Sequence, residues 1–178
     1  MFENETQNYY KELLDFQIYA SKKSTLICSL IMVAFAIFGI VTCFFDLSIG
    51  LFLTMFFGVM AIIFPATMKR TQKKIALKMV RTNYYYTDCL RSKYSFLEDE
   101  IDYFELTNEN EVRGSAKIKY SQIVKVVETN KYFFVYVSSI QAHILQKGGM
   151  TKGSAIELSN FLKDKLGEKY KLDLKAKI

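Results

Sequence analysis

The sequence predicts a membrane α-helical hairpin followed by an α+β domain, and three observations support this fold class. Residues 24–68 contain one charged side chain, Asp46, with about twenty mostly apolar residues on each side, enough for each half to cross a hydrocarbon core of roughly 30 Å. Residues 69–81 then contain six basic residues and no acidic one. Further along the chain, apolar and polar side chains alternate, which is typical of β-strands, before a last amphipathic helix.

The composition limits the classes of protein that the chain can represent. With 178 residues, the hairpin leaves room for one small folded domain. The formal net charge is +6, yet residues 82–178 carry fifteen basic against thirteen acidic side chains, so the positive excess lies in residues 69–81. Nucleic-acid-binding domains spread Lys and Arg over a folded face, so we expect no nucleic-acid partner.

The three cysteines predict neither a disulfide nor a metal site. Cys28 and Cys43 lie near opposite ends of the first span, about 22 Å apart along a helix, which is too far for a bridge. Cys89 has no partner at C-x-x-C spacing, so we interpret all three thiols as inert. No short apolar core with a small-residue cleavage site precedes the first span, so we expect no signal peptide.

Residues 1–23 are amphipathic and predict an N-terminal cytoplasmic helix. Asn4 and Gln7 match a helix-capping pair, and Leu13 and Leu14 follow helical spacing. The polar side carries acidic as well as basic residues, whereas a helix on a membrane surface prefers Lys and Arg. We therefore favour packing on the domain or on a neighbouring helix over packing on the membrane.

The predicted hairpin of residues 24–68 turns at Asp46. Gly50 and Gly58 lie eight residues apart on roughly one face of the second span, and small residues let helices approach closely in lipid. We expect both to mediate contact within the hairpin, with a homo-oligomer interface as the alternative. Pro65 frees a backbone carbonyl in the last turn of the second span and should kink or loosen it.

Flanking charges predict the orientation of the hairpin. Lys22 and Lys23 precede the first span and basic residues follow the second, whereas the turn at Asp46 has neither Lys nor Arg. The positive-inside rule therefore places both termini in the cytoplasm of a multi-pass protein with two spans.

The second span is expected to continue as a basic juxtamembrane helix over residues 69–83. We expect its cations at the lipid bilayer, where juxtamembrane cations gain roughly 1 kcal/mol each from an anionic leaflet. A non-specific topology anchor is the interpretation that we favour, and selective binding of anionic lipid head groups is the alternative. The predicted membrane-surface residues are Lys69, Arg70, Lys73, Lys74, Lys78 and Arg81.

Residues 84–167 predict a strand-rich domain, and residues 168–178 a lysine-rich tail that should fray. Short turns, such as Asn130-Lys131, should make consecutive strands pair antiparallel. Ser154 and Glu157 form a capping box for a helix that can cover the sheet. The predicted strands are residues 93–96, 101–106, 112–120, 123–129, 132–138 and 141–145, with turns at 97–100 and 108–110 and a helical corner at 120–122.

Four segments of this region carry a family resemblance: IKYSQI at 118–123, VVET at 126–129, KYFFVY at 131–136 and AHILQK at 142–147. With the order of two spans, basic helix and strand-rich domain, they make the chain similar to the YcxB-like family of small bacterial membrane proteins. The family pattern has Pro-Lys where this chain has Gln146-Lys147. The resemblance implies a bacterial cell membrane location and a pleckstrin-homology-like antiparallel sheet or partial barrel with a C-terminal helix. Residues 84–90 are the candidate first strand.

The sequence shows no catalytic constellation, so we predict neither an enzyme, nor a cofactor, nor a metal site. His143 has no Cys or carboxylate at ligand spacing, and residues 98–100 read as a solvated acidic turn rather than a calcium site. Residues 148–153 lack the order of a phosphate-binding loop. Lys147 or Lys152 near the following helix N-terminus is nevertheless a candidate anion contact.

Two functional hypotheses remain from the sequence. In the first, the chain is a membrane-tethered cytoplasmic interaction or regulatory module that engages a protein partner, not identified by the sequence, or a lipid head group. In the second, it is a structural or protective membrane protein, in immunity or envelope stress, that acts through its hairpin. An enzyme is the least favoured class, because the chain offers no nucleophile paired with a base.

Overall fold

The computed structural model describes residues 1–87, 91–107 and 109–174, with the backbone alone for residues 82–87. The chain divides into two compact units. The first comprises Met1–Phe16 and Leu77–Ile178, and the second comprises Gln17–Ala76.

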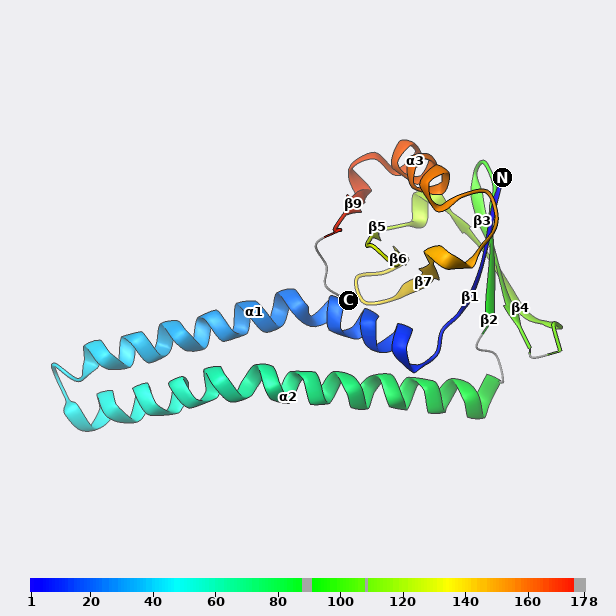
Figure 1. Ribbon diagram of the computed structural model, residues 1–178. Coiled ribbons are helices and arrows are strands. Elements are labelled where there is room, and N and C mark those ends of the chain that lie inside the picture. The colour runs from blue at the N-terminus through cyan, green and yellow to red at the C-terminus, as the bar shows by residue number, and fades with distance from the viewer. Residues whose placement is uncertain (88–90, 108, 175–178) are drawn as a thin grey trace. The chain divides into compact units, whose positions relative to one another are not determined.

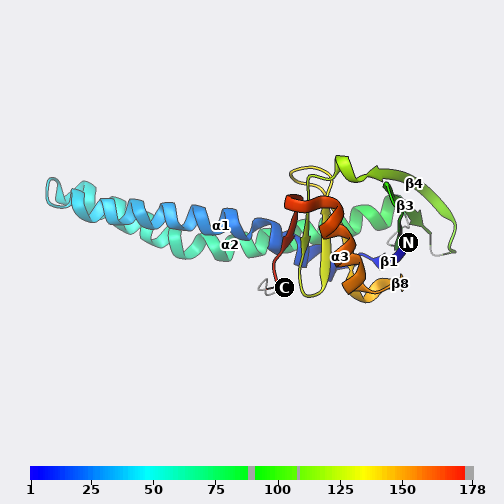
Figure 2. The same cartoon turned by 90° about the horizontal axis from the view of Figure 1, so that it is seen from above.

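Two long helices, α1 (Tyr10–Thr42) and α2 (Leu47–Thr87), run side by side through the second unit (Figures 1 and 2). Both are long and apolar enough to cross a membrane. Asp46 lies in the connecting turn, as predicted, and its Oδ1 accepts hydrogen bonds from the backbone N–H groups of Ser48 and Ile49 at 2.9 and 3.1 Å. The carboxylate thus satisfies backbone donors that the first turn of α2 leaves without intrahelical partners.

Glycines allow the two helices of the hairpin to approach closely. A Cβ atom on Gly39 would lie 2.6 Å from the backbone nitrogen of Thr54, and one on Gly50 would lie 2.4 Å from that of Cys43. The predicted contact through Gly50 is therefore confirmed. The prediction for Gly58 is wrong, because no atom lies within 4 Å of its added Cβ, and Gly39 makes the second close approach instead.

The first unit is built from two sheets and one complete helix. The five-stranded sheet has the order β4-β3-β2-β1-β8, and the four-stranded sheet has the order β7-β6-β5-β9. Helix α3 (Ala155–Leu166) begins at the predicted capping box of Ser154 and Glu157. The strands are β1 (Phe2–Gln7), β2 (Arg91–Phe96), β3 (Glu100–Leu106), β4 (Val112–Lys119), β5 (Lys125–Glu128), β6 (Tyr132–Tyr136), β7 (Ala142–Gln146), β8 (Met150–Lys152) and β9 (Tyr170–Leu172).

The predicted α+β fold class is confirmed, and the predicted antiparallel sheet or partial barrel is present as two sheets that do not close into a barrel. Strands β2, β3 and β4 pair antiparallel in chain order, as do β5, β6 and β7. The helical corner at Tyr120–Gln122 is present as a 3-10 turn, and Glu109 and Asn110 lie in the predicted turn between β3 and β4. Residue 108 of that turn lies outside the described residues.

The N-terminal prediction is wrong for its first residues, which form a strand and not a helix. Strand β1 pairs antiparallel with β2 on one side and with β8 on the other. Asn4 and Thr6 are fully buried, so Asn4 is a core residue rather than a helix cap. The alternation of Phe2, Asn4 and Thr6 on the inner side has the period of a strand, and tertiary pairing overrides the capping signal.

Two further predictions at the boundaries of the domain are wrong. Residues 84–87 continue α2, so they are not the first strand, and residues 88–90 lie outside the described residues. Nor does the tail fray at its start, because β9 pairs parallel to β5 and the backbone N–H of Asp173 donates to Glu128 O at 2.8 Å. This edge position gives the tail a hydrogen-bonding partner that a local reading of the sequence does not show. Residues 175–178 are not described.

The apolar core of the first unit lies between the inner faces of the two sheets and under α3. Leucines at positions 158, 162 and 166 of α3 recur every four residues and close the core on one side, as their helical spacing predicts. Burial of each such side chain stabilises the fold by about 1.5–3 kcal/mol. The buried cluster comprises Tyr94, Phe96, Ile101, Ile118, Tyr120, Ile123, Val126, Phe133, Val135, Leu145, Leu158, Leu162 and Leu166.

The loop before β8 offers a matched test of this packing. A Cβ on Gly149 would lie 2.2 Å from the carbonyl oxygen of Glu5 on β1, whereas one on Gly148 would meet nothing within 4 Å. We expect Gly149→Ala to lower the free energy of unfolding by about 1–3 kcal/mol through overpacking, and Gly148→Ala to change it far less. Denaturant unfolding of the detergent-solubilised full chain, followed by circular dichroism, measures both. Equal stabilities would contradict this close approach.

Candidate functional site

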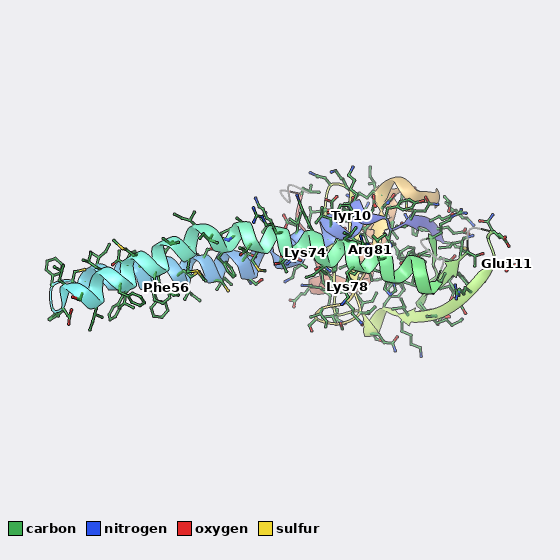
Figure 3. All side chains as sticks on the ribbon, turned by 90° about the horizontal axis from the view of Figure 1, so that it is seen from below. Tyr10, Phe56, Lys74, Lys78, Arg81 and Glu111 are labelled. Atoms are coloured by element: carbon green, nitrogen blue, oxygen red, sulfur yellow. The ribbon has the colours of Figure 1, made fainter. Side chains whose placement is uncertain are left out.

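The basic segment of α2 is the most strongly charged surface that the sequence predicts, and the structure leaves it exposed. Its six Lys and Arg side chains are all exposed. Successive residues of a helix are rotated by about 100°, so Arg70, Lys74, Lys78 and Arg81 lie within roughly 80° of one another around the helix axis. The buried Gln72 and Ala76 lie on the opposite side. Figure 3 shows Lys74, Lys78 and Arg81 in succession along α2. None of the ion pairs among the described residues involves these six cations.

Within Gln17–Ala76, the basic side chains gather at one end of the hairpin. Lys22 and Lys23 on α1 precede its apolar stretch, and Lys69 and Arg70 on α2 follow the apolar stretch of that helix. Because α1 and α2 are antiparallel neighbours, both pairs lie at the end away from the turn. Asp46 is the one acidic residue in this part of the sequence, and it lies in the turn. The hairpin is therefore strongly polarised in charge along its length.

Lys147, a predicted anion contact, is already paired within the domain. Its Nζ lies 2.5 Å from Oε1 of Glu128 and 5.1 Å from the ring centre of Phe133. The ammonium group thus has a counter-charge within the domain, and the anion contact at Lys147 stays a prediction. The sequence does not show this pairing, because the two partners lie nineteen residues apart on different elements.

Glu128 is the centre of a buried polar cluster. Besides Lys147, its carboxylate accepts hydrogen bonds from Ser159 Oγ at 2.7 Å and from the hydroxyl of Tyr170. Burial opposes ionisation, but the hydrogen bonds from Lys147, Tyr170 and Ser159 outweigh it and hold the pKa of Glu128 below 4.5. The cluster joins β5 to α3 and β9, so its geometry indicates a structural role.

Lys152 lies on β8, opposite Glu3 of β1, and its side chain is exposed. The helix N-terminus that follows it is already capped. Glu157 Oε2 accepts from Ser154 N at 2.9 Å, and Ser154 Oγ accepts from Glu157 N at 3.2 Å. A carboxylate thus already accepts a hydrogen bond at this helix N-terminus, and the anion contact at Lys152 stays a prediction.

The histidine lies in an aromatic cluster between the two sheets. His143 Nδ1 lies 3.2 Å from the Tyr94 hydroxyl, and the Tyr103 ring is centred 4.8 Å from the imidazole. Burial lowers the pKa of His143, against a smaller opposite effect of Glu105, and burial also raises the pKa of Tyr94. Within the described ranges, no three His, Cys, Asp or Glu side chains are grouped to hold a metal ion.

A second buried polar cluster, which the sequence reasoning missed, joins the two sheets through β1. Asn4 Nδ2 donates to Gln146 O at 2.8 Å, and Thr6 Oγ1 donates to Asn4 Oδ1 at 2.6 Å. The backbone N–H of Gln146 then donates to Thr6 Oγ1 at 3.0 Å. The inward and outward alternation of side chains along residues 2–7 was the sequence signal for a strand. It was overlooked because the residues that follow have helical spacing.

The first two turns of α1 pack on the outer face of the four-stranded sheet. Phe16 is buried, and its ring lies 5.3 Å from that of Phe134 and 6.0 Å from that of Tyr136. The Tyr132 hydroxyl donates to Asp15 Oδ2 at 2.9 Å. The predicted packing of the N-terminal segment on the domain is therefore confirmed as far as Phe16.

Comparison with known proteins identifies the domain. The family model described as YcxB-like protein matches residues 102–162, which extend from β3 into α3. The resemblance predicted from the sequence is thus confirmed for this region, C-terminal to the two apolar helices. No curated protein and no solved structure matches the chain.

The Glu128 cluster generates a stability prediction. Glu128→Gln leaves the Lys147 ammonium without its counter-charge, so we expect the free energy of unfolding to fall by about 2–3 kcal/mol at neutral pH. Because the folded pKa of Glu128 lies below that of the unfolded chain, this contribution is fully present well above the unfolded pKa and is lost as pH falls through the folded pKa. Denaturant unfolding across this pH range measures both effects. Lys117→Gln, which breaks the exposed pair with Glu100, is the control and should change little.

Proposed function

We propose that this chain, which carries a YcxB-like domain, is a bacterial cell membrane protein whose hairpin holds an interaction or regulatory domain at the cytoplasmic surface. The observation that carries the proposal is that the hairpin helices are built into the domain. Strand β1 leads into α1 after two residues, and the last turns of α2, from Leu77, belong to the same compact unit as the sheets. Both helices of the hairpin thus continue directly into the domain, which suits a tethered module that presents a surface to a partner.

We assign no catalysis to the domain, because its chemistry-bearing side chains are engaged in structural contacts. Glu128 is held by three partners, and His143 lies against Tyr94 and Tyr103. Charged side chains on the strands pair with each other, as Lys93 does with Glu3. Protein–protein or protein–lipid contact is the function class that these features support.

The orientation is tested by cysteine labelling. In a chain with its native cysteines replaced by serine, we expect Asp46→Cys to react with a membrane-impermeant maleimide added to intact cells. Ile140→Cys on the domain, where the native side chain is 82% exposed, should react after permeabilisation alone. The basic flanks of both helices are the physical reason. The reverse labelling pattern would overturn the proposed cytoplasmic location.

The close packing at Gly39 and Gly50 keeps the second hypothesis, a protein that acts through its hairpin, as an alternative. Residues 24–68 can be replaced by an unrelated two-helix anchor, with a photo-crosslinking residue at Ile140 or Ile156, both strongly exposed on the domain. We expect the cellular crosslinking pattern of the domain to survive the replacement, because the partner surface belongs to the domain. Loss of the crosslinks in a folded, inserted chimaera would instead assign the interaction to the hairpin.

A further inference from the structure

We propose that one end of the hairpin binds the phosphate groups of anionic phospholipids through a cationic collar formed by both helices. The collar consists of Lys22 and Lys23 on α1 and of Lys69, Arg70, Lys73 and Lys74 on α2. This inference rests on the proposed function, since it requires the hairpin to lie in a membrane. It goes further by naming the ligand and by separating these residues from the basic residues later in α2.

The collar is a concentrated and uncompensated charge. All six side chains are exposed, and no acidic residue of Gln17–Ala76 lies near them, because Asp46 is in the turn at the far end. Lys147 in the domain shows the contrasting case, a cation whose side chain is mostly covered and paired with Glu128. Exposed cations without internal partners gain most from external anions, at about 1 kcal/mol each near an anionic leaflet.

The position of the collar selects lipid over a soluble anion. Lys23 directly precedes the first apolar stretch, and Lys69 directly follows Met68 at the end of the second. Lys73 and Lys74 follow Met68 by about 7.5 and 9 Å of helix, comparable to the head-group layer of roughly 5–7 Å once a flexible side chain is included. Both helices therefore supply cations at the depth where lipid phosphates lie, and Arg70 adds a guanidinium suited to bidentate phosphate contact.

Lys78 and Arg81 are excluded from the collar by their distance along the helix. They follow Met68 by about 15 and 20 Å of continuous α2, beyond a Debye length of roughly 8 Å at physiological salt. The predicted membrane-surface set of six residues on α2 is therefore narrowed to the first four. The last two provide a control with the same chemical composition as Lys69 and Arg70.

The test uses the full chain reconstituted in phosphatidylcholine bilayers that contain spin-labelled phosphatidylglycerol or spin-labelled phosphatidylcholine. The fraction of motionally restricted probe gives the relative association of the two lipids. We expect a preference of about fivefold for phosphatidylglycerol, the ratio that about 1 kcal/mol gives, and a fall towards unity at high salt. Soluble glycerol phosphate should not displace the lipid, because it lacks the acyl chains that hold the head group at collar depth.

Two matched double variants show which basic residues produce the lipid preference. We expect Lys69→Gln with Arg70→Gln to lower the preference by at least about twofold, and Lys78→Gln with Arg81→Gln to leave it unchanged. Equal association of both lipids with the wild-type chain would overturn the inference and leave the collar as a topology anchor. Equal losses in the two variants would overturn its assignment to the collar. The Asp46→Cys labelling test, done separately in intact cells, separates these outcomes from failure of the proposed orientation.

Discussion

Strand β1 needs hydrogen-bonding partners on both of its edges, and this need determines how the rest of the molecule is arranged. Its partners β2 and β8 come from after the hairpin and from near the end of the chain. Its buried Asn4 and Thr6 are satisfied by the other sheet, through the backbone of Gln146. An unsatisfied buried polar group costs about 1–3 kcal/mol, so these residues fix β1 in one register and bind the two sheets together.

The same constraint shows why the family match and the folded unit differ in extent. Residues 102–162 include the strands from β3 to β8 and part of α3, but neither β1, nor β2, nor β9. Without β2, one edge of β3 would lose its paired strand, and without β9 the Glu128 carboxylate would lose the Tyr170 hydroxyl. The folded domain is therefore larger than the matched segment and includes the N-terminal residues before the hairpin.

Features that depend on local sequence were predictable, and those that depend on distant pairing were not. The two long apolar helices, the turn at Asp46, the antiparallel hairpins and the capping box of α3 each follow from composition, periodicity or residues a few positions apart. Strands β1 and β9 were missed because their stability comes from partners far along the chain. The ion pair of Lys147 was missed for the same reason: its charge was visible in the sequence, and its counter-charge on Glu128 was not.

The chain order of the five-stranded sheet has a consequence for biosynthesis. Strand β1 leaves the ribosome first, but β2 follows only after both apolar helices have been made, and β8 follows later still. The nascent β1 must therefore wait, unpaired, while the apolar segments are synthesised. Non-local pairing of this kind is slow and leaves apolar surface exposed during folding. Completion of the five-stranded sheet therefore follows synthesis of the hairpin.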